Sequence, residues 1–198
     1  MSAGAAAFVL AGHRPALAIR AGGHDVPPKR RPFGPRLADL NPDRMWPVYR
    51  RYHLLIVSQR DDDRSGALTT AVVEVLSRYL SSSRPQLVRA ADSRRIGVLI
   101  ATDQQDVAIM QTDSAEALFL AKPPFADIPQ APLRIIVSFG SHVFVCRPNF
   151  AASHAYLLAK TLAEHGEELP APAAAPNGVV PAHPGARAFF AGEEMPND

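Results

Sequence analysis

The chain has 198 residues, of which 47% are hydrophobic and 20% charged, and its formal net charge is +2. This composition supports a packed core and excludes global disorder, and the small net charge gives no indication of a nucleic-acid partner. The single cysteine, Cys146, excludes an internal disulfide, and its apolar surroundings predict an inert buried thiol. No apolar run reaches the ~18 residues that are needed to cross a bilayer.

Residues 1–51 are predicted to form a flexible, basic N-terminal arm. They hold nine Lys or Arg against three Asp, and the proline-rich stretch 27–32 is incompatible with a helix interior. Such an arm is either a solvated tail or a contact for a partner or an acidic lipid surface. The apolar run 3–12 lacks the basic segment that precedes it in a signal peptide, so we expect a poor export signal.

Three apolar strand-like runs, each followed by a helical pattern, open the predicted core. The first helix carries its apolar residues on one face, at positions 68, 72, 75, 76 and 79. Short links join the predicted strands 54–57, 86–90 and 106–110 to the predicted helices 67–80, 94–101 and 112–121. Because strand and helix alternate, we predict an α/β fold with a parallel, mixed-edge sheet flanked by helices.

The second half of the chain is predicted to complete this lobe. Residues 133–139 and 142–147 are β-rich and are broken at Gly140, which predicts either a hairpin or one bent strand with a bulge. A helix follows over 151–165, with Gly166 as its C-terminal cap. The lobe is thus expected over 52–166, and 167–198 is expected to be a Pro/Ala linker and a short helix that packs back on the lobe.

Three loops bring helix N-termini to the carboxyl edge of the predicted sheet. Free N–H groups and the helix dipole attract an anion there, by roughly 0.3–1 kcal/mol for each helix. Hydroxyl groups in these loops can donate to a carboxylate. The sequence therefore predicts a small-anion site, although each residue could also serve only as a helix cap. The candidate ligand-binding residues are Ser65, Gly66, Ser93, Gln111, Thr112 and Asp113.

Three consecutive aspartates, 61–63, lie beside the first of these loops. They are interpreted as a solvated turn. A cation site is the alternative, but the spacing of an EF-hand is not present.

The sequence offers no pattern of a known catalytic centre. Ser65 lacks a G-x-S-x-G context, and neither a P-loop nor a G-x-G-x-x-G motif is present. The histidines do not have the spacing of metal ligands. We therefore predict a protein that is not an enzyme and that uses no cofactor or metal.

Four segments resemble the TAXI type of solute-binding protein, the receptors of TRAP-like transporters. The most specific are Gln-Thr-Asp-Ser-Ala at 111–115 and His-Pro-Gly-Ala at 183–186. Residues 54–80 and 88–100 are similar to the first strand, ligand loop and helix of the family and to its serine-containing segment, with Ser93 at the serine. The similarity covers roughly residues 52–194.

The resemblance implies one lobe of a type II periplasmic-binding-protein-like fold. Family members carry a second lobe and hold the ligand between the two, but this sequence passes directly from 133–147 into the late helix of the first lobe. We therefore expect a single lobe that binds a small carboxylate weakly or forms a homodimer through its exposed cleft face. The alternative is a non-catalytic protein-interaction module with a vestigial ligand site.

The resemblance also implies a cellular context. It indicates a periplasmic location and the membrane subunits of a transporter as partners. The weak export signal leaves a cytoplasmic location as the alternative.

Overall fold

A computed structural model describes residues 53–128 and 131–197. All of these residues belong to one compact unit. The predicted N-terminal arm, residues 1–51, lies outside the described residues.

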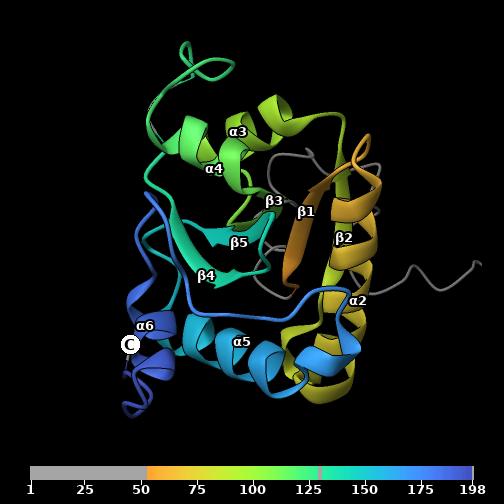
Figure 1. The fold of residues 1–198 in the computed structure, drawn as a ribbon, viewed down its shortest axis with the longest axis vertical. Helices are drawn as coiled ribbons and strands as arrows, with labels where there is room; N and C mark the ends of the chain where they lie inside the picture. Colours follow the sequence, from red (N-terminus) through yellow and green to blue (C-terminus); the bar gives the residue numbers. More distant parts are fainter. Residues whose placement is uncertain (1–52, 129–130, 198) are drawn as a thin grey trace, which may run out of the picture. The chain divides into compact units, whose positions relative to one another are not determined.

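A five-stranded mixed sheet forms the centre of this unit (Figure 1). Strand β1 (Leu55–Gln59) pairs in parallel with β2 (Gln86–Ala90) on one side and β3 (Val107–Gln111) on the other. Strand β5 (His142–Cys146) runs antiparallel to β3, so that the strand order is β2-β1-β3-β5-β4. The predicted α/β class is confirmed, with three parallel strands followed by an antiparallel pair.

Strands β4 (Arg134–Ser138) and β5 form a hairpin, which decides between the two predicted arrangements. Their register shifts between Ile135 and Val137, so the hairpin also contains an irregularity of the bulge type. The turn at residues 139–141 reverses the chain and inserts β5 between β3 and β4.

The helices begin and end close to their predicted positions, with one clear exception. Helix α2 (Asp63–Tyr79) starts four residues before the predicted 67, because Asp62 caps it. The predicted glycine cap of the late helix is wrong, since the C-cap residue is His165 and Gly166 opens a 3-10 turn. The remaining elements are α3 (Ser93–Ala101), α4 (Thr112–Phe119), α5 (Ala152–Glu164), α6 (Pro184–Phe190), η2 (Ser81–Ser83) and η3 (Gly166–Glu168).

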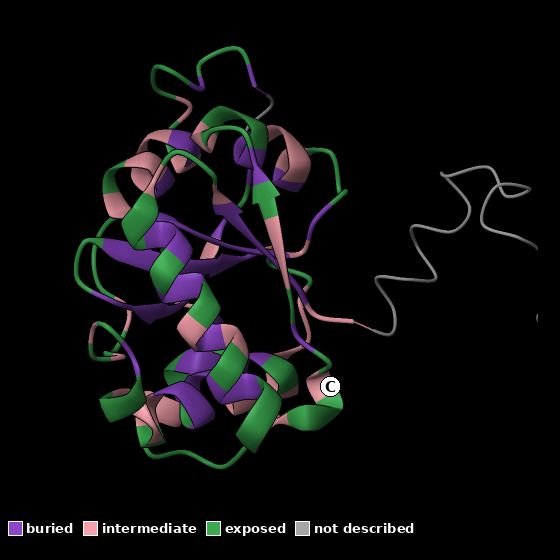
Figure 2. Cartoon of the chain, turned by 90° about the vertical axis from the view of Figure 1, so that its right-hand side faces the viewer, coloured by how far each residue is buried: buried purple, intermediate pink, exposed green. Residues whose placement is uncertain are grey.

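Two hydrophobic clusters, one on each face of the sheet, make up the core. Consecutive residues of a strand point to opposite faces, so Ile56 joins the cluster with α2, α5 and α6, while Val57 joins the cluster with α3 and α4. In Figure 2 the strands are largely buried, except β2 at the edge of the sheet, and the helices are exposed along their outer side. Cys146 is fully buried in the first cluster, as predicted, and burial raises the pKa of its thiol.

The segment between α5 and α6 runs along β4. Ala174 exchanges two backbone hydrogen bonds with Ser138, at 2.9 and 3.0 Å, and Ala182 forms a parallel bridge with Ile135. Helix α6 then packs on α5. In the described part of the chain, none of the helices has the length and apolar character of a bilayer-spanning segment.

Gly185 sets the distance between α5 and α6. A Cβ atom at this position would lie 1.9 Å from the carbonyl oxygen of Ala152, so a side chain forces the two helices apart. We expect Gly185→Ala to lower the free energy of unfolding by about 1–3 kcal/mol, measured by urea denaturation. Gly166→Ala is the matched control, since the nearest atom to its Cβ would be 3.8 Å away. Equal stability of the two variants would show that this close approach does not constrain the packing.

Candidate functional site

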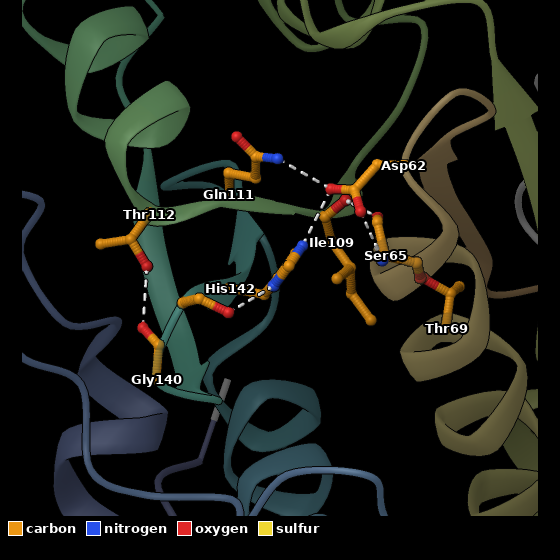
Figure 3. Close-up of polar contacts among 9 residues, drawn as sticks. Asp62, Ser65, Thr69, Ile109, Gln111, Thr112, Gly140 and His142 are labelled. Atoms are coloured by element: carbon orange, nitrogen blue, oxygen red, sulfur yellow. Dashed lines mark hydrogen bonds and ion pairs between the residues drawn. The ribbon is translucent and has the colours of Figure 1, made fainter.

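Asp62 is the centre of a polar cluster at the carboxyl edge of the parallel strands (Figure 3). Its carboxylate accepts a hydrogen bond from the backbone N–H of Ser65 at 3.1 Å, which caps α2. The same carboxylate accepts from the side-chain amide of Gln111 at 3.0 Å and contacts Nε2 of His142 at 3.0 Å. Asp62 thereby joins the first helix to the end of β3 and the start of β5.

This position corrects the interpretation of residues 61–63 as a solvated turn. The Asp62 side chain is only 10% exposed, whereas Asp61 and Asp63 are exposed. The middle carboxylate alone points inward, because it is the N-cap residue of α2 and its neighbours are not.

Two opposing influences act on the pKa of Asp62. Burial raises the pKa of Asp62. The hydrogen bonds from His142, the Ser65 N–H and Gln111 together lower it by more than burial raises it, so the pKa lies below its ordinary value of 3.8. The carboxylate is therefore ionised at neutral pH. Asp62 is thus the negatively charged group of this cluster.

His142 continues the cluster towards the surface. Its side chain is 6% exposed and its Nδ1 atom lies 3.0 Å from the hydroxyl oxygen of Ser141, which is exposed. When Nε2 carries the proton that Asp62 accepts, Nδ1 accepts from the Ser141 hydroxyl. The two contacts of the imidazole, with the Ser141 hydroxyl and with the Asp62 carboxylate, fix the orientation of the His142 ring.

The structure places Ser65 and Gly66 in the first turn of α2 rather than in an open loop. Ser65 is fully buried, and its hydroxyl donates to the carbonyl of Ile109 at 3.4 Å. Gly66 is covered by Arg89, since a Cβ atom on Gly66 would lie 2.7 Å from a guanidinium nitrogen of that arginine. The exposed cation of Arg89 therefore lies directly against the N-terminal turn of α2.

Ser93 is the first residue of α3 and is half-buried. The preceding residue, Asp92, caps the helix by accepting from the N–H of Arg95 at 2.6 Å. Two of the three predicted helix N-termini, those of α2 and α3, are thus already occupied by a carboxylate of the chain itself.

Helix α4 begins differently. Its N-cap residue, Gln111, makes no capping hydrogen bond with its side chain, which instead contacts Asp62. The N–H of Thr112 donates to Ser141 and its hydroxyl donates to Gly140, at 3.0 and 3.1 Å, while Asp113 is exposed. The third N-terminus is therefore attached to the β4–β5 turn and has no side-chain cap.

The six predicted residues thus lie along one edge, as parallel strands require, but only Gln111 and Ser65 contact the same side chain, Asp62. Arg89 and His142 were not predicted as neighbours of this edge, and Asp62 was interpreted as part of a solvated turn. The strand order brings His142 opposite Gln111 in the β3–β5 register, and a single sequence gives no signal for that pairing.

One group of potential metal ligands exists among the described residues: His165, Glu167 and Glu168, on the surface. Glu168 is already paired with Arg78 at 2.6 Å and accepts from the hydroxyl of Tyr79. These contacts assign the group a structural role between α2 and η3.

No protein-family model matches the chain, and no curated protein matches it significantly. The family resemblance described above therefore depends on its sequence segments alone.

The charge of Asp62 is expected to stabilise the fold above about pH 4. Asp62→Asn keeps a cap for α2 but removes the charge, so we expect a loss of about 1–2 kcal/mol of unfolding free energy at pH 7. Because the pKa of Asp62 is lowered on folding, this contribution is present above the unfolded value near 3.8 and is lost as the pH falls through the folded value. Urea denaturation at pH 7 and at progressively lower pH should show the two proteins converging.

Asp61→Asn is the control for this prediction. Its side chain is exposed, so we expect a change within about 0.5 kcal/mol at pH 7. A constant difference between wild type and Asp62→Asn at every pH would contradict an electrostatic origin.

Proposed function

We propose that this chain is a single solute-binding lobe, related to the receptors of the TAXI family, that holds a small carboxylate at the carboxyl edge of its sheet. The observation that carries the proposal is the position of Arg89. Its guanidinium is exposed and lies against the first turn of α2, beside Gly66. The carboxylate of Asp62 already caps this turn, so the positive charge that would attract an anion here comes from Arg89 itself.

The side chain of Arg89 has no hydrogen bond or ion pair within residues 53–128 and 131–197. A guanidinium can hold a carboxylate through two parallel hydrogen bonds, which gives both charge and geometry. Ser93, at the start of the helix that follows β2, supplies a hydroxyl donor close to Arg89 in sequence. In this proposal Arg89 provides the charge and Ser93 helps to orient the ligand.

The uncapped N-terminus of α4 supplies the other end of the proposed site. Thr112 and Asp113 begin this helix, and the first-turn N–H groups lack a side-chain acceptor. Gln111 is held towards the centre of the edge by Asp62. A ligand with a second polar group would meet these residues. Ser65 donates to Asp62 and Ile109 and so holds the turn in place, and Gly66 allows Arg89 to approach this turn.

The sheet supports the finer fold assignment within the same proposal. A parallel set β2-β1-β3 with an antiparallel strand β5 between β3 and β4 is compatible with a lobe of the type II periplasmic-binding-protein-like kind. The described residues form one compact unit with one sheet. A ligand on a single lobe stays partly exposed to solvent, so the proposed binding is weak.

The wider context belongs to the proposal as well. The resemblance supports a periplasmic location, transporter membrane subunits as partners, and binding without catalysis. Nucleic acid is not among the proposed partners.

Thermal unfolding with small carboxylates tests the proposed site. We expect millimolar glutamate or 2-oxoglutarate to raise the melting temperature by several degrees. At a ligand concentration of about 100 times the dissociation constant, binding stabilises the folded protein by about 2.7 kcal/mol. Arg89→Ala should abolish the shift, and Ser93→Ala or Thr112→Ala should reduce it.

Arg187→Ala and Ser77→Ala are the matched controls, because both residues are exposed on helices away from this edge. They should leave the shift unchanged. The carboxylate proposal fails if wild type and Arg89→Ala respond equally to every acid tested.

A second candidate is the non-catalytic interaction module, with a vestigial ligand site and a homodimer through the cleft face. The specific observation in its favour is that Asp62 and Asp92 already fill the N-termini of α2 and α3. Light scattering separates the two: a stable dimer without any carboxylate shift would favour the module, provided that Thr112→Arg at the same edge dissociates the dimer.

A further inference from the structure

The hydroxyl of Ser141 is the exposed end of a row of three polar side chains. Its oxygen lies 3.0 Å from Nδ1 of His142. Nε2 of the same ring lies 3.0 Å from a carboxylate oxygen of Asp62 (Figure 3), and these two side chains are only 6% and 10% exposed. A hydroxyl, a base within hydrogen-bond distance and a third group that orients the base form the arrangement of an activated nucleophile.

The charge of Asp62 decides which ring nitrogen acts as the base. The carboxylate is ionised at neutral pH and only accepts hydrogen bonds, so Nε2 of His142 carries the proton. In the neutral ring, Nδ1 is then the acceptor, and it lies at the Ser141 hydroxyl. Asp62 thus positions the base, and Nδ1 of His142 is the atom that can take the hydroxyl proton.

The β4–β5 turn keeps Ser141 at the surface beside this ring. Gly140 has a φ of 75°, a left-handed value that glycine adopts without strain. The N–H of Phe139 donates to the carbonyl of His142 at 2.8 Å, so Gly140 and Ser141 alone form the loop between them. A loop this short does not fold over Ser141, which is exposed.

The N-terminus of α4 is attached to the same turn. The N–H of Thr112 donates to the carbonyl of Ser141, and its hydroxyl donates to the carbonyl of Gly140, at 3.0 and 3.1 Å. The N-cap residue, Gln111, makes no capping hydrogen bond with its side chain. The N-terminus of a helix stabilises negative charge, and the carbonyl oxygen of an ester gains such charge when a hydroxyl attacks it.

We propose that Ser141 is a nucleophile that cleaves small activated carboxylic esters. Its oxygen forms a bond to the carbonyl carbon of the ester while the hydroxyl proton passes to Nδ1 of His142. The bond to the leaving alkoxide breaks, the imidazole gives the proton to that alkoxide, and the acyl group stays on Ser141. Water then attacks the acyl group, passes a proton to the same nitrogen and releases the acid, and the proton returns to the Ser141 oxygen.

The surroundings of Ser141 define the class of ester. Its neighbours Gly140, Gln111 and Asp113 are exposed, so the edge is open and does not enclose the substrate. Binding at an open edge is weak, and the ester therefore needs a good leaving group. This activity goes beyond the proposed carboxylate binding and does not depend on Arg89. It replaces the expectation of a protein without catalysis.

The test is hydrolysis of 4-nitrophenyl acetate by the full chain at neutral pH, followed by the absorbance of 4-nitrophenolate. We expect saturable hydrolysis with an initial burst, because the acyl group accumulates on Ser141. Ser141→Ala should remove the burst and lower kcat/KM about 100-fold. This variant keeps the seven histidines of the chain, so hydrolysis by other imidazoles remains as the baseline. Ser77→Ala, exposed on α2 away from this edge, should keep the full burst.

Two further variants separate the base from the group that positions it. His142→Gln removes the base but keeps a side chain that can donate to Asp62, and it should lower kcat as far as Ser141→Ala. In Asp62→Asn the amide can donate to Nε2, so the proton moves to Nδ1, which no longer accepts from Ser141. We expect a lower kcat with an unchanged KM, at a temperature where circular dichroism shows that the variant is folded.

Covalent labelling identifies the nucleophile without turnover. With phenylmethylsulfonyl fluoride, the Ser141 oxygen forms a bond to sulfur, fluoride leaves, and the hydroxyl proton passes to His142. Mass spectrometry of the digested protein should locate this label on Ser141 in wild type and in Ser77→Ala, and should find Ser141 unlabelled in His142→Gln.

Three results would overturn the proposal. Equal hydrolysis by wild type and Ser141→Ala would assign the reaction to other side chains. Absence of the sulfonyl label from Ser141 would show that its hydroxyl is not activated. An unchanged kcat in Asp62→Asn would remove Asp62 as the group that positions the base.

Discussion

The carboxylate of Asp62 is the contact on which the arrangement of the carboxyl edge depends. It caps α2, orients the amide of Gln111 and fixes the imidazole of His142, which in turn orients Ser141. These groups come from the first strand–helix connection, from β3 and from β5. Within residues 53–128 and 131–197, Asp62 is the one largely buried negative charge at this edge. One ionised group thus connects the start of α2 with β3 and β5. This connection adds to the hydrophobic contacts that hold the same elements together.

Much of the fold follows from local sequence patterns, because apolar runs and helical periodicity are local properties. The strand 86–90 is found at its predicted limits, and the predicted burial of Cys146 is confirmed. The polar edge could not be predicted to the same degree. Asp61, Asp62 and Asp63 are chemically identical, and only the residue at which α2 begins selects which one turns inward. The contact between Asp62 and His142 spans 80 residues and requires the order of the strands, which periodicity does not contain.

The same sheet presents different chemistry at its two ends. At the carboxyl edge, aspartates of the chain satisfy two helix N-termini and Arg89 remains as an exposed cation, which underlies the proposed carboxylate site. At the amino edge, a cavity lies beside the buried residue Gln105 and has Leu54, Val107 and Leu158 among its apolar walls. Charge therefore dominates the proposed carboxylate site, whereas the amino edge presents mainly uncharged side chains.

The segment that runs along β4 has a consequence for self-association. Its hydrogen bonds to Ile135 and Ser138 occupy backbone groups on the outer side of β4. A strand from another molecule therefore cannot pair with the full length of β4 on that side. On the opposite side of the sheet, β2 pairs only with β1 within the described chain. Strand exchange or fibril-like stacking between copies would therefore begin at β2, where Pro85 before the strand and the exposed charge of Arg89 within it act against such growth.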